Sequence, residues 1–528
     1  MTTMFTRSLS RGFPVDMGWM KLYGAPVDSL FRKLMTRKPQ WTVVQKMSSS
    51  AATDVSTKPR PFTEIPGPKA YPFVGTMTGN MSDFTNIVPF FRKRCEKYFP
   101  LYKERMMGQD IVILIGAEGI EKFFRKEAKY PNRFSIPMWN DYREVSGEEY
   151  GIFTGQDEKW HRMRSVIDKP MLRMKDVKNY TDEINDVITD FLDRLQQVRG
   201  QDNIVPNLEE EFFNWSLEAV GTVLYERRFG GLSDHRDPEM ERFIKAVADM
   251  FQLTAELFLT PLWLVKYLQR KKYKKQLEAW DILFKTAKSC VDKRMNEISI
   301  SMEKGDEARG VLAYLLAQKS MSISEIYANV TELMMAAVDT TSSSMLWCLY
   351  EISQQPDVQD KLFAEVKSCV GETTTPGYED LQHLPYMKAV IKETLRLYPA
   401  AGSISRITEE PVELYGYEIP AKSTVSVPAY AVSRLPQYFD DPDKFVPERW
   451  MKDRTDRPNP FAYLPFGIGT RMCVGRRVAE LEMHLLLSRL MQRFRIEPAF
   501  TEPVKIAQRL VLRPAQPIKV KFIKRQGD

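Results

Sequence analysis

The stretch that most constrains this chain is PFGIGTRMCVGRRVAELEM, residues 465–483, in which one cysteine separates a glycine-rich turn from a predicted helix. Gly467 and Gly469 allow a tight turn that larger residues resist, and Gly475 lets the backbone and a flat ligand approach closely where the helix begins. Cys473 would lie at a helix N-terminus, where unpaired N–H groups favour its thiolate. Arg471 is placed to pair with a carboxylate of a ligand. A single cysteine is usually an inert core residue, but composition alone would rarely produce this whole pattern.

A bound haem would use both groups, with the thiolate on iron and the guanidinium on a propionate. The pattern F-G-x-G-x-R-x-C-x-G, which begins at Phe466, resembles the haem-binding loop of the cytochrome P450 family. The resemblance extends over nearly the whole folded chain. It implies a mainly α-helical cytochrome P450 fold, with a large helical domain, a small β-rich domain, and haem between a long distal helix and a proximal cysteine loop. It also implies haem b as the cofactor and Cys473 as the axial ligand of its iron.

Composition and periodicity agree with a mainly helical globular protein. The 528 residues are 43% hydrophobic and 27% charged, which is enough to bury a sizeable core. Long helical patterns cover 181–199, 276–299 and 324–353, and short β-like runs occupy 112–116, 412–420 and 423–430.

The five scattered cysteines argue against a disulfide framework and a zinc site. The modest net charge of +7 gives no reason to expect nucleic acid as a partner.

The N-terminal region predicts targeting to mitochondria. Arg7 and Arg11 lie among hydroxyl residues with no acid before Asp16, as in a mitochondrial presequence. We expect a presequence at 1–46, a linker at 47–60, and the catalytic domain at 61–528. The alternative is a basic tail without targeting value. The longest apolar runs fall short of the roughly 18 residues that a membrane span requires.

The segment TELMMAAVDTTSSSMLW, residues 331–347, is similar to the family's long distal helix. Ala336 and Ala337 would leave room for O2 and substrate. Asp339 and Thr340 would supply an acid and a hydroxyl as catalytic proton donors. The alternative is ordinary packing, because threonine can bond back to its own helical turn.

A charged pair occurs within the largely apolar helix predicted at 386–398. Glu393 and Arg396 are three residues apart, so they share a face of the helix. Burying both charges requires further hydrogen bonds, and the resemblance implies Arg449 as the third member of a structural network. An exposed pair on a helix surface is the more common arrangement for an isolated motif of this kind.

Further residues are assigned to haem by the resemblance. Trp160 and Arg164 match the family's W-x-x-x-R helix and would reach one propionate. Arg406, seven residues after Pro399, would reach the second propionate.

A basic group on the cysteine side suggests how electrons arrive. Lys388 and Lys392 can face solvent from the helix that holds Glu393, and two arginines follow the cysteine. In the mitochondrial branch of the family, matching residues dock a [2Fe–2S] ferredoxin, which a flavoprotein reductase supplies with electrons from NADPH. The alternative is a solvated basic face. The docking residues that we predict are Lys388, Lys392, Arg476 and Arg477.

The family's layout places an apolar substrate pocket beside the haem. The stretch 257–276 combines apolar residues with lysines and could rest on a membrane surface; a solvated helix–loop–helix is the alternative. Together with Ala336 and Ala337, the predicted pocket residues are Ile136, Met138, Trp139, Ser403 and Ile404.

We therefore expect a haem-thiolate monooxygenase on the matrix side of the inner mitochondrial membrane, in peripheral contact with it. Scaffold phrases such as WSLEAVGTVLYERRFG, residues 215–230, are similar to the branch that contains vitamin D 24-hydroxylase and sterol 27-hydroxylase. Its substrate would be a steroid, a secosteroid or a similar lipophilic molecule. The alternatives are a monooxygenase of foreign compounds, a haem-thiolate isomerase or dehydratase, and a haem-binding sensor or carrier without turnover.

Overall fold

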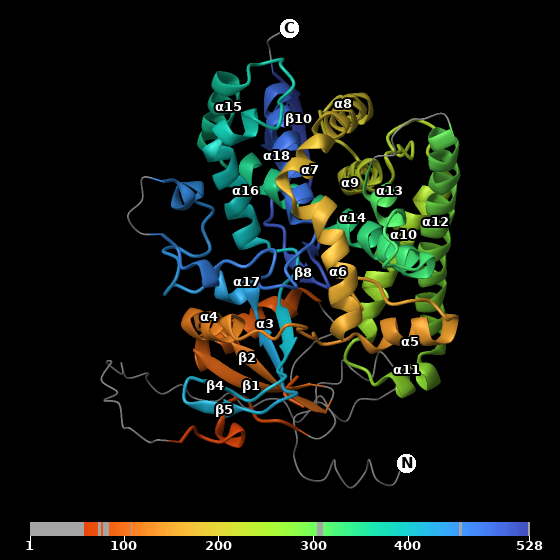
Figure 1. The fold of residues 1–528 in the computed structure, drawn as a ribbon. Coiled ribbons are helices and arrows are strands. Elements are labelled where there is room, and N and C mark those ends of the chain that lie inside the picture. Colours follow the sequence, from red (N-terminus) through yellow and green to blue (C-terminus); the bar gives the residue numbers. More distant parts are fainter. Residues whose placement is uncertain are drawn as a thin grey trace, which may run out of the picture.

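The computed structural model describes residues 58–71, 75–77, 84–106, 108–303, 310–452 and 457–525. The predicted presequence at 1–46 and the first part of the predicted linker lie outside these residues. The described chain has a large helical part and a smaller part built around a β-sheet (Figure 1). The predicted architecture, a large helical part with a small β-rich part, is therefore confirmed.

The elements agree with the predicted helical majority. The helices up to the centre of the chain are α3 (Phe84–Tyr98), α4 (Ala117–Arg125), α5 (Pro137–Ser146), α6 (Asp157–Leu172), α7 (Met174–Val177), α8 (Thr181–Val198), α9 (Leu208–Tyr225), α10 (Pro238–Leu257), α11 (Leu262–Leu268) and α12 (Arg270–Glu303). The later helices are α13 (Gly310–Leu316), α14 (Ile323–Ser353), α15 (Pro356–Cys369), α16 (Pro385–Leu397), α17 (Ala429–Val432) and α18 (Arg476–Arg493). The strands are β1 (Leu101–Met106), β2 (Gln109–Leu114), β3 (Ile404–Ile407), β4 (Val412–Leu414), β5 (Tyr417–Ile419), β6 (Thr424–Val427), β7 (Phe494–Pro498), β8 (Ile506–Gln508), β9 (Leu512–Pro514) and β10 (Val520–Lys524). Short 3-10 turns cover Phe62–Glu64, Lys178–Tyr180, Asp380–His383, Pro447–Trp450 and Pro460–Ala462.

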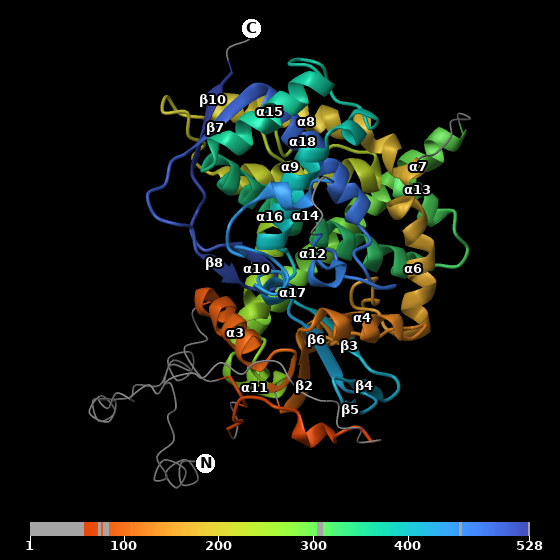
Figure 2. The same cartoon turned by 90° about the vertical axis from the view of Figure 1, so that its left-hand side faces the viewer.

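The helix α14 runs through the centre of the helical part (Figure 2). A capping box starts it, because Ser322 accepts a hydrogen bond from the Glu325 N–H while the Glu325 carboxylate accepts one from the Ser322 N–H. Nearly all of its side chains are buried, including polar ones such as Glu332 and Asp339, which are paired with Arg143 and Arg513. It packs against α9, α10, α12 and α16.

The main sheet joins two distant parts of the sequence. Its strand order is β1-β2-β6-β3, with β2 parallel to β6 and antiparallel pairing elsewhere. This sheet and α4 supply much of a second hydrophobic core, separate from the core of the helical part. Since β3 pairs with β6, the sheet fixes the position of the chain at Ile404 and Arg406.

The last residue of the predicted linker pairs with the β-rich part of the chain. The Arg60 N–H donates to the carbonyl of Gly416 at 2.8 Å, and the Glu418 N–H donates to the carbonyl of Arg60 at 2.9 Å. Arg60, the last residue of the predicted linker, is therefore held against β5. The composition of 47–60 contains no signal for this pairing, since it depends on a strand more than 350 residues away.

Candidate active site

The loop before α18 fixes the position of Cys473. Gly467 and Gly469 have φ angles of +70° and +76°, in the left-handed region that favours glycine. The Cys473 N–H donates to the carbonyl of Phe466 at 2.8 Å and so closes the loop. Gly475 caps α18, and a Cβ atom at Gly475 would lie 3.9 Å from the Cys473 sulfur. The cysteine therefore precedes a helix N-terminus, as predicted.

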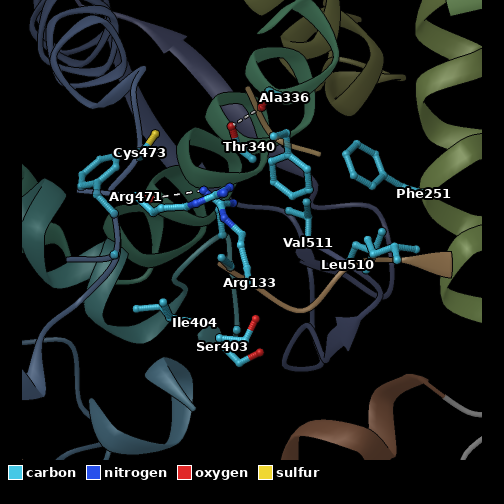
Figure 3. A pocket seen from close by; sticks show the side chains of 18 of the residues that line it. Arg133, Phe251, Ala336, Thr340, Ser403, Ile404, Arg471, Cys473, Leu510 and Val511 are labelled. Atoms are coloured by element: carbon cyan, nitrogen blue, oxygen red, sulfur yellow. Dashed lines mark hydrogen bonds between the residues drawn. The ribbon is translucent and has the colours of Figure 1, made fainter. Parts of the chain in front are cut away.

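Cys473 lines a cavity of about 650 Å³. Figure 3 shows its sulfur on one side of this cavity, with Ala336 and Thr340 of α14 on another wall. Other walls come from α3, α10, β3, β6 and the turn between β8 and β9. Most of the lining side chains are apolar, so the cavity suits a lipophilic ligand.

The Cys473 side chain is accessible, and because it lies deep in the protein this accessible surface faces the cavity. Burial raises the pKa of the Cys473 thiol, because the thiolate loses its hydration. The Gly475 N–H and the charges of Arg164 and Arg133 act in the opposite direction. The helix N-terminus therefore does not by itself outweigh burial, in contrast to our expectation. Coordination to a metal would deprotonate this thiol outright.

Four arginines lie together beside the cysteine and line the same cavity: Arg133, Arg164, Arg406 and Arg471. Burial and the three neighbouring cations lower the pKa of Arg471 to about 8. Burial, Arg406 and Arg164 lower the pKa of Arg133 to about 10. The site therefore holds more positive charge than its own acids balance, which favours an anionic ligand.

Several hydrogen-bond donors in this cluster are free to bind such a ligand. Arg471 donates to the carbonyls of Pro131 at 2.6 Å and Gly155 at 2.9 Å, and its guanidinium lies 3.9 Å from the ring centroid of Trp160. Its Nη1, the Arg133 Nε and the Trp160 Nε1 are buried without a hydrogen-bond partner among the described residues. Such donors are costly to leave unpaired. A thiol, a large apolar cavity and free donors for carboxylates fit haem and its propionates.

The remaining predicted haem residues differ in how many of their hydrogen-bond donors are still available for a ligand. Arg406 lines the cavity but already pairs with Glu127 at 2.6 Å and donates to the carbonyl of Ile468 at 2.9 Å. Arg164 forms an ion pair with Asp168 within α6. Phe466, Gly467 and Gly475 all line the cavity.

Thr340 and Asp339 point in different directions from α14. Thr340 lines the cavity, and its Oγ1 donates to the carbonyl of Ala336 at 2.7 Å (Figure 3). Asp339 does not line the cavity and pairs instead with Arg513 at 3.2 Å. Successive side chains on a helix point about 100° apart, which explains the difference. Burial raises the pKa of Asp339, while Arg513 opposes this shift.

The structure brings Glu393, Arg396 and Arg449 together in a buried network. The Glu393 carboxylate accepts hydrogen bonds at 2.8 Å from both arginines. It also accepts hydrogen bonds at 2.9 Å from the Val446 N–H and the Trp450 indole. Arg396 donates in addition to three backbone carbonyls. The charges are therefore paired and hydrogen-bonded, as burial requires.

The predicted docking residues occupy neighbouring positions on α16 and α18. Lys392 and Arg477 are exposed, whereas Lys388 and Arg476 are half-buried. Both arginines pair with Glu480, at 2.9 and 3.3 Å, which reduces the positive charge of this face. Burial, and after it the charge of Lys392, lower the pKa of Lys388, so the two lysines lie close enough to repel each other.

The predicted pocket residues line the cavity with one exception. Met138 is buried in the core instead. It lies in the first turn of α5, where successive side chains point about 100° apart, so it is directed away from the cavity that Trp139 lines. The Trp139 indole donates to Thr254 at 2.8 Å. The predicted residues on the lining are Ile136, Trp139, Ala336, Ala337, Ser403 and Ile404.

Sequence reasoning missed Arg133, Phe251 and the turn at 509–511, all of which line the cavity. Arg133 follows no recognisable pattern, and Phe251 is one of many apolar residues on α10. The turn between β8 and β9 lies close to the C-terminus, and only folding brings it beside α14. The sequence QRLV, residues 508–511, contains no glycine and no motif that would predict a ligand-binding turn.

Comparison with known proteins supplies a family. The family model for Cytochrome P450 matches residues 65–522. The mitochondrial 1,25-dihydroxyvitamin D(3) 24-hydroxylase of Rattus norvegicus is 33% identical over 500 residues, covering 92% of this chain and 95% of the relative. The mitochondrial sterol 26-hydroxylase of Mus musculus is 37% identical over 444 residues, covering 81% and 83%. Cytochrome P450 10 of Lymnaea stagnalis is 34% identical over 491 residues, covering 89% and 87%.

Proposed function

Because this chain belongs to the cytochrome P450 family, among its mitochondrial members, and is a monooxygenase, we propose that it hydroxylates a steroid, a secosteroid or a similar lipophilic molecule. One oxygen atom of O2 would enter a C–H bond of the substrate. The observation that carries this proposal is one cysteine in the wall of a large apolar cavity, beside a cluster of arginines. Membership of the family implies haem iron, which supplies the activation of O2 when bound.

The proposed ligand of haem b iron is the Cys473 thiolate. Arg471, Arg164 and Trp160 would bind the propionates, and the unpaired donors of Arg471 and Trp160 support this role. Arg133, with its own unpaired Nε, would join them. Arg406 would contribute mainly positive charge, because its donors are already used. Phe466, Gly467 and Gly475 would shape the surface around the sulfur.

The proposed proton donor in the cavity is the hydroxyl of Thr340. Its Oγ1 lies on the cavity wall and can exchange its present partner, the carbonyl of Ala336, for a ligand atom. Asp339 would return a proton to Thr340 after its carboxyl group leaves Arg513. This role requires a rotation of the Asp339 side chain, since its carboxylate is turned toward β9.

The proposed substrate class rests on the apolar lining and on the relatives. Those relatives are named for hydroxylation of a vitamin D compound and of sterols. The cavity volume of about 650 Å³ lies within the usual range for small-molecule sites, about 300–1,000 Å³. Part of this volume would be taken by haem, so the substrate would occupy the portion between α10, α14 and the turn at 509–511.

We propose a ferredoxin with a [2Fe–2S] cluster as the electron donor, reduced by an NADPH-dependent flavoprotein. The exposed Lys392 and its neighbour Lys388 support a docking site for an acidic partner. Arg476 and Arg477 would join this site when the partner's acids compete with Glu480. Charge complementarity of this kind raises the association rate.

The proposed location is the matrix side of the inner mitochondrial membrane, in peripheral contact. In the described part of the chain no helix has the length and apolar character to cross a bilayer. The helix α11 exposes Trp263, Tyr267 and Leu268, and the lysine-rich start of α12 follows it. An exposed apolar face beside lysines suits a membrane surface with anionic lipids.

The test is a ligand screen followed by product analysis. Haem-loaded protein is titrated with sterols, secosteroids, ecdysteroids and common foreign compounds while the haem spin state is measured. A tight response to one steroid class, and a product that gains one oxygen atom with NADPH, reductase and ferredoxin, are expected. Weak responses to many unrelated compounds would favour metabolism of foreign compounds. Haem binding without NADPH consumption would favour a sensor or carrier.

A further inference from the structure

Arg509 differs from the other arginines of the cavity. It lines the cavity and is half-buried, and its Nε is buried without a hydrogen-bond partner. In residues 58–525, as far as they are described, no hydrogen bond or ion pair reaches its guanidinium. A buried guanidinium donor without a partner is costly, so a ligand that supplies one is favoured.

The other cavity-lining arginines either pair with an acid or belong to the cluster that is proposed to bind the propionates. Arg92 pairs with Asp443 at 2.6 Å, and four more arginines form the cluster beside Cys473. Arg513, four residues after Arg509, is engaged by Asp339 at 3.2 Å and Glu209 at 2.7 Å. Arg513 also lies outside the cavity lining. Among the cavity-lining arginines of the described residues, Arg509 is therefore the one that has no acidic partner and does not belong to the cluster beside Cys473.

The backbone holds Arg509 in a defined place. It lies in the turn between β8 and β9, where its N–H donates to the carbonyl of Val511 at 3.2 Å. The next residues are tied to the chain before β3, because the Leu512 N–H donates to the carbonyl of Ala400 at 2.9 Å. Figure 3 shows Leu510, the neighbour of Arg509, across the pocket from Cys473 and on the side of Phe251. The carboxylate of Glu256, at the end of α10, is close enough to the Arg509 guanidinium to raise its pKa, so the guanidinium lies on the α10 side of the cavity, the side on which Phe251 lies across from Cys473 (Figure 3).

The charges around Arg509 indicate what kind of group it binds. Burial and Arg513 lower the pKa of Arg509, whereas Glu209, Asp339 and Glu256 raise it. Glu256 is paired with Lys272 at 2.8 Å. The three carboxylates are therefore balanced by the three cations Arg509, Arg513 and Lys272, so an anionic ligand would add a negative charge that nothing in this group compensates. An uncharged oxygen accepts the guanidinium hydrogen bond without adding that charge.

We propose that Arg509 determines substrate specificity by donating a hydrogen bond to an uncharged oxygen, a hydroxyl or a carbonyl, at the end of the substrate remote from the reacting carbon. This inference rests on the proposed function, because it assigns one end of the same substrate. A lipophilic molecule with one such oxygen would be anchored at Arg509 and would present its opposite end toward Cys473. The anchor would therefore also select the carbon that is oxidised.

The test measures binding of paired probes to the haem-loaded protein by equilibrium dialysis. One pair is cholestanol and cholestane, and the second is dodecanol and dodecane; each pair differs by one hydroxyl group. The wild-type protein is expected to bind the alcohol about tenfold more tightly than the hydrocarbon, the size of one hydrogen bond to a charged group. Arg509→Gln is expected to remove this preference.

The matched control is Lys505→Gln, which makes the same change in charge and size on an exposed residue just before β8, outside the cavity lining. It should keep the tenfold preference. If Arg509→Gln does not fold, Arg509→Lys, with a shorter single donor, should lower the preference at least threefold.

The outcomes separate this inference from the proposed function. If only the dodecanol pair binds and shows the Arg509-dependent preference, the inference stands and the steroid assignment is wrong. If Arg509→Gln keeps the wild-type preference, or if the wild-type protein prefers neither alcohol, the inference is overturned.

Discussion

Replacing Glu393 by Gln should lower the free energy of unfolding by about 3–5 kcal/mol, the cost of removing one partner from a buried ion pair. The Glu393 and Arg396 side chains are both 0% exposed, and Arg449 pairs with the same carboxylate at 2.8 Å. The variant would leave two buried guanidinium groups without a counter-charge. It would also turn an amide N–H₂ toward donors that now bind carboxylate oxygens.

The control is Glu480→Gln, which makes the same change in another carboxylate that pairs with two arginines. The Glu480 side chain is 23% exposed, and its partners Arg476 and Arg477 are 38% and 42% exposed. Water screens these pairs, so this variant should cost less than about 1 kcal/mol. The two variants therefore differ mainly in burial.

The assay is urea unfolding of the haem-loaded proteins, followed by far-ultraviolet circular dichroism at equal haem occupancy. The free energies are compared where the slopes with urea agree. If unfolding is irreversible, unfolding rates at a fixed urea concentration replace the free energies. Equal losses for both variants would refute the argument that burial, not pairing alone, sets the cost.

The remaining predictions concern the site and its partners. Cys473→Ala should abolish the thiolate-type spectrum of the ferrous carbonyl adduct, because no other thiol among the described residues lines the cavity; an unchanged spectrum would eliminate Cys473 as the ligand. Lys388→Gln combined with Lys392→Gln should reduce ferredoxin-supported turnover about tenfold at low salt and spare peroxide-driven turnover, and equal losses in both assays would contradict the docking role. Thr340→Ala should increase the hydrogen peroxide released per product formed, since the cavity loses the Thr340 hydroxyl, the proposed proton donor. Unchanged coupling of NADPH consumption to product would exclude that role for Thr340.

Local signals in the sequence were sufficient for the family and for much of the secondary structure. The pattern around Cys473 depends on residues within one loop, and Gly467 and Gly469 have the left-handed backbone that such a turn needs. The long helical patterns at 181–199, 276–299 and 324–353 correspond to α8, α12 and α14. The cysteine loop and the helices depend on the spacing of residues along the chain, so both can be predicted from the sequence.

Directions of side chains and charge balance were decided only by packing. Met138 and Asp339 lie next to cavity residues in the sequence, but the helical turn directs them elsewhere. The pKa of Cys473 reflects burial as well as the helix N-terminus, and burial depends on the surrounding fold.

By itself the sequence determined the cysteine loop, the helical majority and membership of the cytochrome P450 family, because motifs and periodicity are local properties of the chain. The tertiary structure alone decided which groups face the cavity and which are already paired. Arg509 and Arg513 look equivalent in the sequence, yet Arg513 is neutralised by acids from α9 and α14 while Arg509 lines the cavity without a partner in the described structure. Ion pairing depends on distances between segments far apart in the chain, and only folding sets those distances.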